Sequence, residues 1–109
     1  MDGPAETSNL SRMAERAEDA AELLASMANP KRLLVLCHLV EGERSVGDLA
    51  TLVELGQSAL SQHLSKMRAL GLVKTRRSGQ TIFYRLASAE VRTLLGTLYD
   101  LYCKPPSPN

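Results

Sequence analysis

The side chains best suited to covalent chemistry are two thiols, Cys37 and Cys103, which lie far apart in the sequence. A thiolate attacks sulfane sulfur or peroxide, and a second thiol can resolve the adduct into a sulfur bridge. The two residues form no CxxC motif, and two cysteines do not make the disulfide framework of a small secreted protein. A cysteine on a buried helix is also common as a small hydrophobic residue. The elements that carry the two thiols therefore decide whether they act as a pair.

Candidate metal ligands and catalytic groups are scarce in the sequence. A structural zinc site needs four good ligands, and the chain offers its two cysteines with His38 and His63. Cys37 and His38 are adjacent, so they point about 100° apart on a helix and cannot easily share one ion. No Ser/His/Asp constellation and no glycine-rich phosphate loop is present. We therefore expect no metal site, no cofactor and no enzyme, with a thiol-dependent enzyme as the alternative that measurable turnover of peroxide or polysulfide would support.

The ionic side chains are distributed unevenly along the chain. None of the twelve acids falls between Leu55 and Ala89. That window holds six basic residues, which are Lys66, Arg68, Lys74, Arg76, Arg77 and Arg85. The rest of the chain has seven basic residues against twelve acids, a net charge of −5. A basic segment without acids indicates binding to a polyanion such as DNA, although chance clustering on a solvated face would look similar.

The first half of this window, Gln57 to Leu70, is predicted to be an amphipathic helix. Leu60, Leu64 and Met67 fall within one narrow arc of the helical wheel and predict a buried stripe. Polar residues occupy the opposite side and its flanks: Gln57, Ser58, Ser61, Gln62, His63, Ser65 and Lys66. Short polar side chains let a helix enter the major groove and bond base edges or phosphates, and free N–H groups at the helix N-terminus suit a phosphate. The alternative is an ordinary solvated helix face.

The second half of the window predicts a β-hairpin. Two β-prone runs, Leu72 to Arg77 and Thr81 to Leu86, flank the three-residue loop Ser78-Gly79-Gln80. The tip carries Arg76, Arg77 and Gln80. Arginine at such a tip suits the narrow, negative minor groove of DNA.

Four further helices are expected to position these groups. They run from Leu10 to Ala28, from Pro30 to about Val40, over a short segment capped by Ser45, and from a Ser88 cap to Cys103. The predicted fold is mainly α with a small β-hairpin, and the order of four helices, hairpin and helix is the winged helix-turn-helix plan. Residues 10–103 form one domain between a disordered N-terminal tail, 1–9, and a Pro-rich tail, 104–109. The last helix carries more apolar surface than one face needs, which is typical of packing against a partner subunit.

At these residues the chain resembles the ArsR/SmtB family of bacterial transcriptional repressors. The matching segments are ANPKRLLVL (28–36), SVGDLA (45–50), GQSALSQHLSKMRALGLV (56–73) and RRSGQTIFYRL (76–86). The resemblance implies a homodimer through the first and last helices that occludes double-stranded operator DNA until an inducer releases it. An activator that displaces another DNA-bound protein, and a protein-interaction module that has lost DNA binding, stay open as alternatives.

The resemblance also bears on what is sensed. The family's thiolate motif corresponds here to Ser45–Leu49, which has no cysteine, and its site on the last helix corresponds to Ser88, Glu90, Leu101 and Lys104. Neither ligand set is present, so a metal- or metalloid-responsive repressor is only the alternative. Cys37 on the second helix and Cys103 at the end of the last resemble the thiol-switch branch of the family. That branch implies that a persulfide, polysulfide or oxidant joins the two thiols in a disulfide or longer sulfur bridge and weakens DNA binding.

No stretch of eighteen apolar residues occurs, and residues 1–9 are polar and acidic rather than a signal peptide. We therefore expect no membrane association and a cytoplasmic location.

Overall fold

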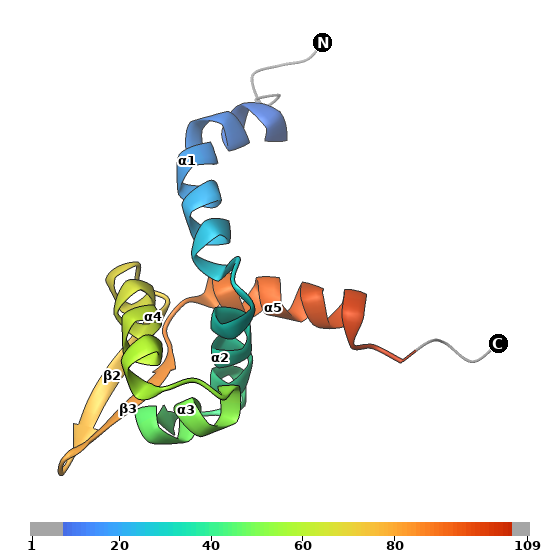
Figure 1. Cartoon of the computed structure of the whole chain (residues 1–109). Helices are drawn as coiled ribbons and strands as arrows, with labels where there is room; N and C mark the ends of the chain where they lie inside the picture. The colour runs from blue at the N-terminus through green and yellow to red at the C-terminus, as the bar shows by residue number, and fades with distance from the viewer. Residues whose placement is uncertain (1–7, 106–109) are drawn as a thin grey trace.

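The structure is a computed structural model that describes residues 8–105 (Figure 1). These residues form five helices and three strands in the order α1 (Asn9–Met27), α2 (Pro30–Glu41), β1 (Arg44–Ser45), α3 (Val46–Val53), α4 (Gln57–Ala69), β2 (Val73–Ser78), β3 (Thr81–Leu86) and α5 (Ala89–Tyr102). The predicted winged helix-turn-helix fold is confirmed. Most of the expected N-terminal tail and the end of the C-terminal tail lie outside the described residues, and Asn9, placed in that tail, begins α1.

Side-chain caps fix where the helices begin. Asn29 accepts hydrogen bonds from the backbone N–H groups of Lys31 and Arg32, with Pro30 in the first turn of α2. Ser45 caps α3 and Ser88 caps α5 in the same way. All three predicted caps are confirmed, because each is a short polar residue directly before an apolar helical pattern.

The sheet differs from the expected hairpin in two respects. The two-residue strand β1 adds to the edge of β3, so the order is β1-β3-β2, and Ser45 pairs with Phe83. The register also pairs Ser78 with Thr81, which leaves Gly79 and Gln80 as a two-residue loop where three residues were predicted. Gly79 has a φ of 64°. A glycine with positive φ at the first loop position suits a tight turn whose twist matches the two strands.

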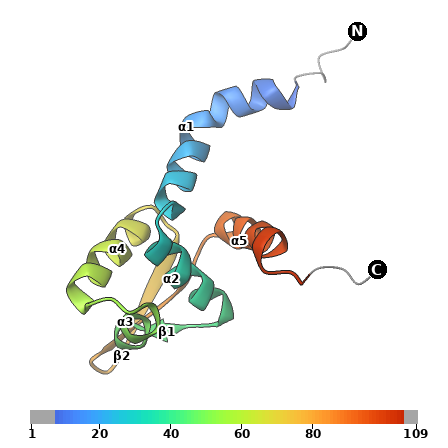
Figure 2. The same cartoon turned by 45° about the vertical axis from the view of Figure 1, so that its right-hand side comes forward.

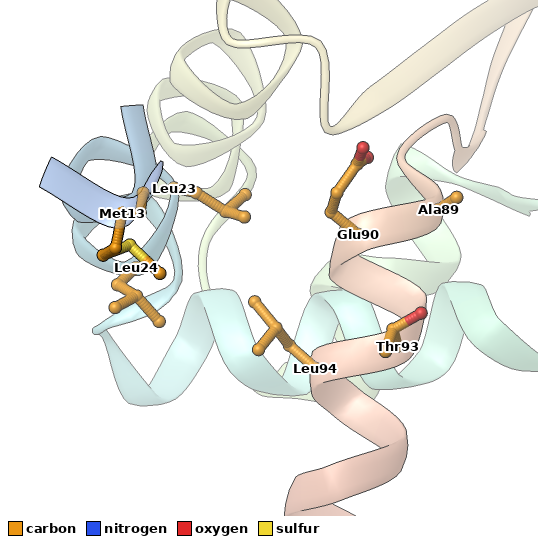
Figure 3. Close-up of a pocket in the computed structure, with 8 residues that line it drawn as sticks. Met13, Leu23, Leu24, Ala89, Glu90, Thr93 and Leu94 are labelled. Atoms are coloured by element: carbon orange, nitrogen blue, oxygen red, sulfur yellow. The ribbon is translucent and has the colours of Figure 1, made fainter. Parts of the chain in front are cut away.

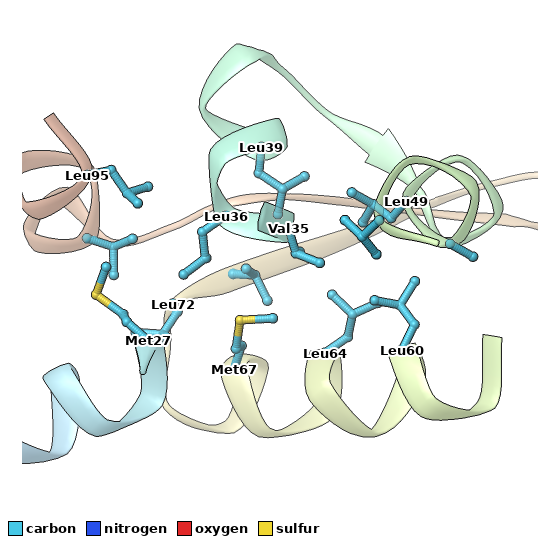
Figure 4. Close-up of a cluster of buried hydrophobic side chains, with 14 residues drawn as sticks. Met27, Val35, Leu36, Leu39, Leu49, Leu60, Leu64, Met67, Leu72 and Leu95 are labelled. Atoms are coloured by element: carbon cyan, nitrogen blue, oxygen red, sulfur yellow. The ribbon is translucent and has the colours of Figure 1, made fainter. Parts of the chain in front are cut away.

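The core lies between α4 and the rest of the winged body. Leu60, Leu64 and Met67 are fully buried, as predicted, and Figure 4 shows them facing the apolar side chains of α2 and α3. Burial of side chains of this size stabilises a fold by roughly 1.5–3 kcal/mol each. The buried stripe therefore fixes which face of α4 is turned to the solvent.

Helix α1 extends away from this body, and both views show it without a neighbour along most of its length (Figures 1 and 2). Only Ser26 and Met27, at its C-terminal end, are buried. No single helix among residues 8–105 is long and apolar enough to cross a membrane; α1 and α2 reach that length and composition only together, and they meet at 91°.

Candidate nucleic-acid interface and thiol pair

The outer face of α4 presents most of the residues predicted to read DNA. Six of them are exposed: Gln57, Ser58, Ser61, Gln62, Ser65 and Lys66. The helix begins after Gly56, and no side chain caps its first N–H groups. A polar face of short side chains with open amides at its N-terminus can meet both base edges and a phosphate.

A side chain of α2 makes a hydrogen bond to the turn that precedes α4. The ammonium of Lys31 donates a hydrogen bond to the carbonyl of Val53, the last residue of α3. Glu54 follows in the left-handed conformation with a φ of 56°. This contact satisfies a helix C-terminus with a cation, which suits both the open carbonyl and the helix dipole.

His63 has a different environment from the other predicted DNA-binding residues of α4. It is half-buried, and its Nδ1 accepts a hydrogen bond of 3.0 Å from Nε of Arg32. The same guanidinium donates to the carbonyl oxygen of Ser26 at 3.3 Å. Arg32 thus joins the C-terminal end of α1 to α4, and His63 can accept its bond only while Nδ1 carries no proton.

Protein stability is expected to depend on pH through His63. Burial, and then the charges of Arg32 and Lys66, lower its pKa below the ordinary 6.5. Between the folded pKa and 6.5 the unfolded chain binds a proton that the folded chain does not, so stability rises with pH through this window and is complete above it. Urea unfolding of the wild type and of His63→Gln across this range measures the effect.

The glutamine variant keeps an oxygen acceptor for Arg32 and should lose that pH dependence. His38→Gln, which alters the other histidine, should retain it. An equal slope in the wild type and in His63→Gln would contradict the assignment.

The wing, defined as β2 and β3 with their loop, presents its cations unequally. Arg77 and Gln80 are exposed at the tip. Arg76 instead bonds to the carboxylate of Glu43, with its Nη2 at 2.7 Å from Oε1. Lys74 and Arg85 are exposed and lie directly opposite each other on neighbouring strands. Two like charges in that arrangement repel each other, so a bound anion would relieve this repulsion.

The two predicted sensor thiols share Tyr99 as a neighbour. Cys37 is half-buried on α2, and Cys103 is exposed directly after the last residue of α5; both are free. A hydrogen bond with the Cys37 side chain, then burial, then the proximity of Cys37, Glu41 and Cys103 raise the pKa of Tyr99 to about 12. The backbone N–H of Cys103 donates to the Tyr99 carbonyl at 2.8 Å. That bond belongs to the backbone at the end of α5, whereas the effect of both thiols on the pKa of Tyr99 relates its hydroxyl to Cys37 and Cys103.

Within residues 8–105, no three His, Cys, Asp or Glu side chains gather as a metal would require. The partners Arg32 and Glu43 were not predicted, because each lies more than thirty residues from the side chain that it contacts. No local signal marks Glu43, because Asp48 and Glu54 lie between it and the acid-free window.

An apolar groove separates α1 from α5. It has a volume of about 580 Å³. Figure 3 shows Met13 and Leu24 of α1 on one side and Glu90, Thr93 and Leu94 of α5 on the other.

Comparison with known proteins places this architecture in a family. Residues 29–75 match the family model described as bacterial regulatory protein, arsR family. The transcriptional activator HlyU of Vibrio cholerae is 49% identical over 96 residues, which are 88% of this chain and 89% of that protein. The nodulation protein NolR of Rhizobium meliloti is 59% identical over 88 residues, 81% of this chain and 72% of that protein. The crystal structure of the transcriptional repressor BigR from Xylella fastidiosa superimposes with a TM-score of 0.84 at 42% identity, covering 90% of this chain and 100% of that one.

HlyU and BigR are regulators of transcription, and the similarity to HlyU extends over nearly the whole of both chains. The chain therefore belongs to the arsR family of bacterial regulatory proteins, as a winged helix-turn-helix transcriptional regulator and not an enzyme.

Proposed function

We propose that the protein is a cytoplasmic repressor that binds operator DNA as a homodimer and loses operator affinity when Cys37 and Cys103 become joined by sulfur. The observation that carries the thiol part is the position of the Tyr99 hydroxyl, because Cys37 and Cys103 both raise the pKa of this group. Two reactive groups that share one neighbour on two different helices can be bridged, and the bridge would then tie α2 to the end of α5.

The DNA part of the proposal is supported by the exposed face of α4 and by the wing. The acid-free window folds into these two elements, so its cations gather on one half of the molecule. A recognition helix in the major groove and a basic wing beside it account for both.

The homodimer is supported by the groove between α1 and α5. Large apolar side chains of these helices are exposed in the single chain, among them Leu24 at 56% and Leu101 at 68%. A second copy placed with its own α1 and α5 against these helices would bury such surface symmetrically, as closed dimers do. Two recognition helices would then face two half-sites on one side of the DNA.

The bridging chemistry balances without a cofactor. With an organic trisulfide, one cysteine thiolate attacks the central sulfur and displaces an organic thiolate; the second cysteine attacks the same sulfur and displaces the other. The two thiols lose two electrons and two protons, which leave with two organic thiols. With peroxide, a sulfenic acid forms first, and the second thiol converts it to a disulfide with release of water. A direct disulfide requires Cα atoms roughly 4.4–6.8 Å apart, whereas a sulfur chain reaches further.

Separate treatment of the reduced protein with an organic trisulfide, hydrogen peroxide and zinc chloride tests the proposal. Intact mass and affinity for a duplex of the protein's own promoter are measured after each treatment. We expect the trisulfide or peroxide to bridge the thiols within one chain and to weaken binding. Weakening by zinc alone would favour metal sensing, and no binding by the reduced protein at low salt would remove the DNA-binding role. Transcription from the bound promoter then distinguishes repression from activation.

The wing contributes a further expected result. Arg77→Ala should lower operator affinity and reduce the slope of log affinity against log salt concentration by about 1, because one phosphate contact is lost. Fluorescence anisotropy over a salt series measures the slope. Arg12→Ala, which removes an exposed cation of α1 outside the proposed interface, is the matched control. An unchanged slope for Arg77→Ala would exclude this side chain from the interface.

A further inference from the structure

Arg76 and Glu43 form a two-point ion pair between the wing and the segment that leads into β1. The Nε of Arg76 lies 2.9 Å from each carboxylate oxygen of Glu43, and its Nη2 lies 2.7 Å from Oε1. The side chain of Glu43 is only 26% exposed. A planar guanidinium held through two nitrogens is fixed in orientation as well as in charge.

The guanidinium of Arg76 also packs with its flat face against an aromatic ring. Its central carbon lies 4.7 Å from the centre of the Phe83 ring. Phe83 is the residue of β3 that pairs with Ser45 in β1 and with Arg76 in β2. Arg76 therefore contacts the β1 side of the sheet through Glu43 and the middle strand through Phe83, a combination that lysine could not reproduce.

Arg77, the next residue along the strand, differs in each of these respects. Adjacent residues of a strand point to opposite faces. Both arginines are exposed, but within residues 8–105 Arg77 takes part in no ion pair. Gln80 lies beyond it in the loop.

We infer that Arg76 is a positioning residue, which with Glu43 and Phe83 sets the direction of the wing, and that Arg77 and Gln80 provide the DNA contacts of the wing's tip. The inference rests on the proposed binding of DNA by the wing. Arg76 bonds to Glu43 through Nε and Nη2, so a two-point contact with a phosphate would require it to leave Glu43 and expose an unpaired carboxylate next to a polyanion. Glu43 already offers the two oxygens in the geometry that a phosphate would offer.

The electrostatics of the pair agree with this geometry. The hydrogen bond from Arg76, and then the charges of Arg76 and Arg85, lower the pKa of Glu43, and the Glu43 bond raises the pKa of Arg76. Both groups are therefore charged at neutral pH.

Charge reversal separates a positioning role from a DNA contact. Arg76→Glu alone places two carboxylates together, and we expect affinity for the promoter duplex to fall by about fivefold or more. Combining it with Glu43→Arg restores the pair in reverse and keeps the net charge. We expect the double variant to regain most of the affinity, with the salt slope of the wild type. An affinity that stays at the level of Arg76→Glu would overturn the inference, because the cation at position 76 itself would then be required.

The neighbouring arginine supplies the control for general electrostatics. Arg77→Glu should lower the affinity, and Glu43→Arg should not restore it, because Arg77 does not bond to Glu43. Equal rescue at both positions would show an effect of net charge alone and would also overturn the inference. If the wing does not touch DNA, Arg77→Glu should leave the affinity for the promoter duplex unchanged. That result is independent of the effect of Arg76→Glu on the affinity.

Discussion

Cys37→Ser and Cys103→Ser are each expected to abolish the response to an organic trisulfide while leaving the affinity of the reduced protein for its operator nearly unchanged. Serine has almost the same shape as cysteine but cannot hold a sulfur chain, so neither variant can close the bridge. In the wild type, a bridge between α2 and α5 should lower operator affinity by roughly 5- to 150-fold, the usual range for coupling between two sites. Anisotropy with a promoter duplex, before and after treatment, measures the difference.

Tyr99→Phe provides a matched control for this experiment. It removes the hydroxyl whose pKa is raised by Cys37 and Cys103, and it keeps both thiols. We expect this variant still to form the bridge and to lose affinity, with an altered rate. If either serine variant retains the full trisulfide response, the two-thiol switch is wrong.

A charge placed in the groove between α1 and α5 is expected to convert the dimer into a monomer. Leu24→Lys changes a side chain that is 56% exposed in the single chain, so the monomer loses little of its core. Within a dimer the ammonium would be buried without a partner, at a cost of about 3 kcal/mol or more, which raises the dimer dissociation constant on the order of 100-fold. Sedimentation velocity over a concentration series measures the constant, and operator affinity should fall with it.

Leu52→Lys is the matched variant for this prediction. Leu52 is also an exposed leucine, at 42%, but it lies on α3 outside the groove. Its dimer dissociation constant should equal that of the wild type. If Leu24→Lys leaves the dimer dissociation constant as unchanged as Leu52→Lys does, the dimer interface lies outside the groove.

Local patterns were sufficient to predict most of the fold. The stripe of Leu60, Leu64 and Met67 and the caps at Asn29, Ser45 and Ser88 depend on neighbours within a few residues, and all were predicted correctly. Strand β1 was missed because two residues are too few to show the alternation of apolar and polar side chains that marks a strand. The strand exists because it pairs with Phe83 and Tyr84, far along the chain. The hairpin loop was predicted one residue too long because its length follows from the pairing of Ser78 with Thr81.

The roles of single polar residues were less predictable for the same physical reason. On a helical wheel His63 flanks a polar face, and in the sequence Arg76 is one cation among six. Their partners Arg32 and Glu43 come from elements 31 and 33 residues away. Only the folded chain shows that these two side chains are already engaged within the protein.

The long exposed stretch of α1 ties the folding of this helix to the amount of protein present. A helix of 19 residues with almost no tertiary contacts is marginal in water on its own. Where a second copy of the chain covers α1, the free energy of dimer association adds to the stability of the folded helix. That stability therefore varies with the protein concentration. At low expression a larger share of the chains would carry a frayed α1, so the cell's supply of the protein would itself determine how many molecules are competent to act.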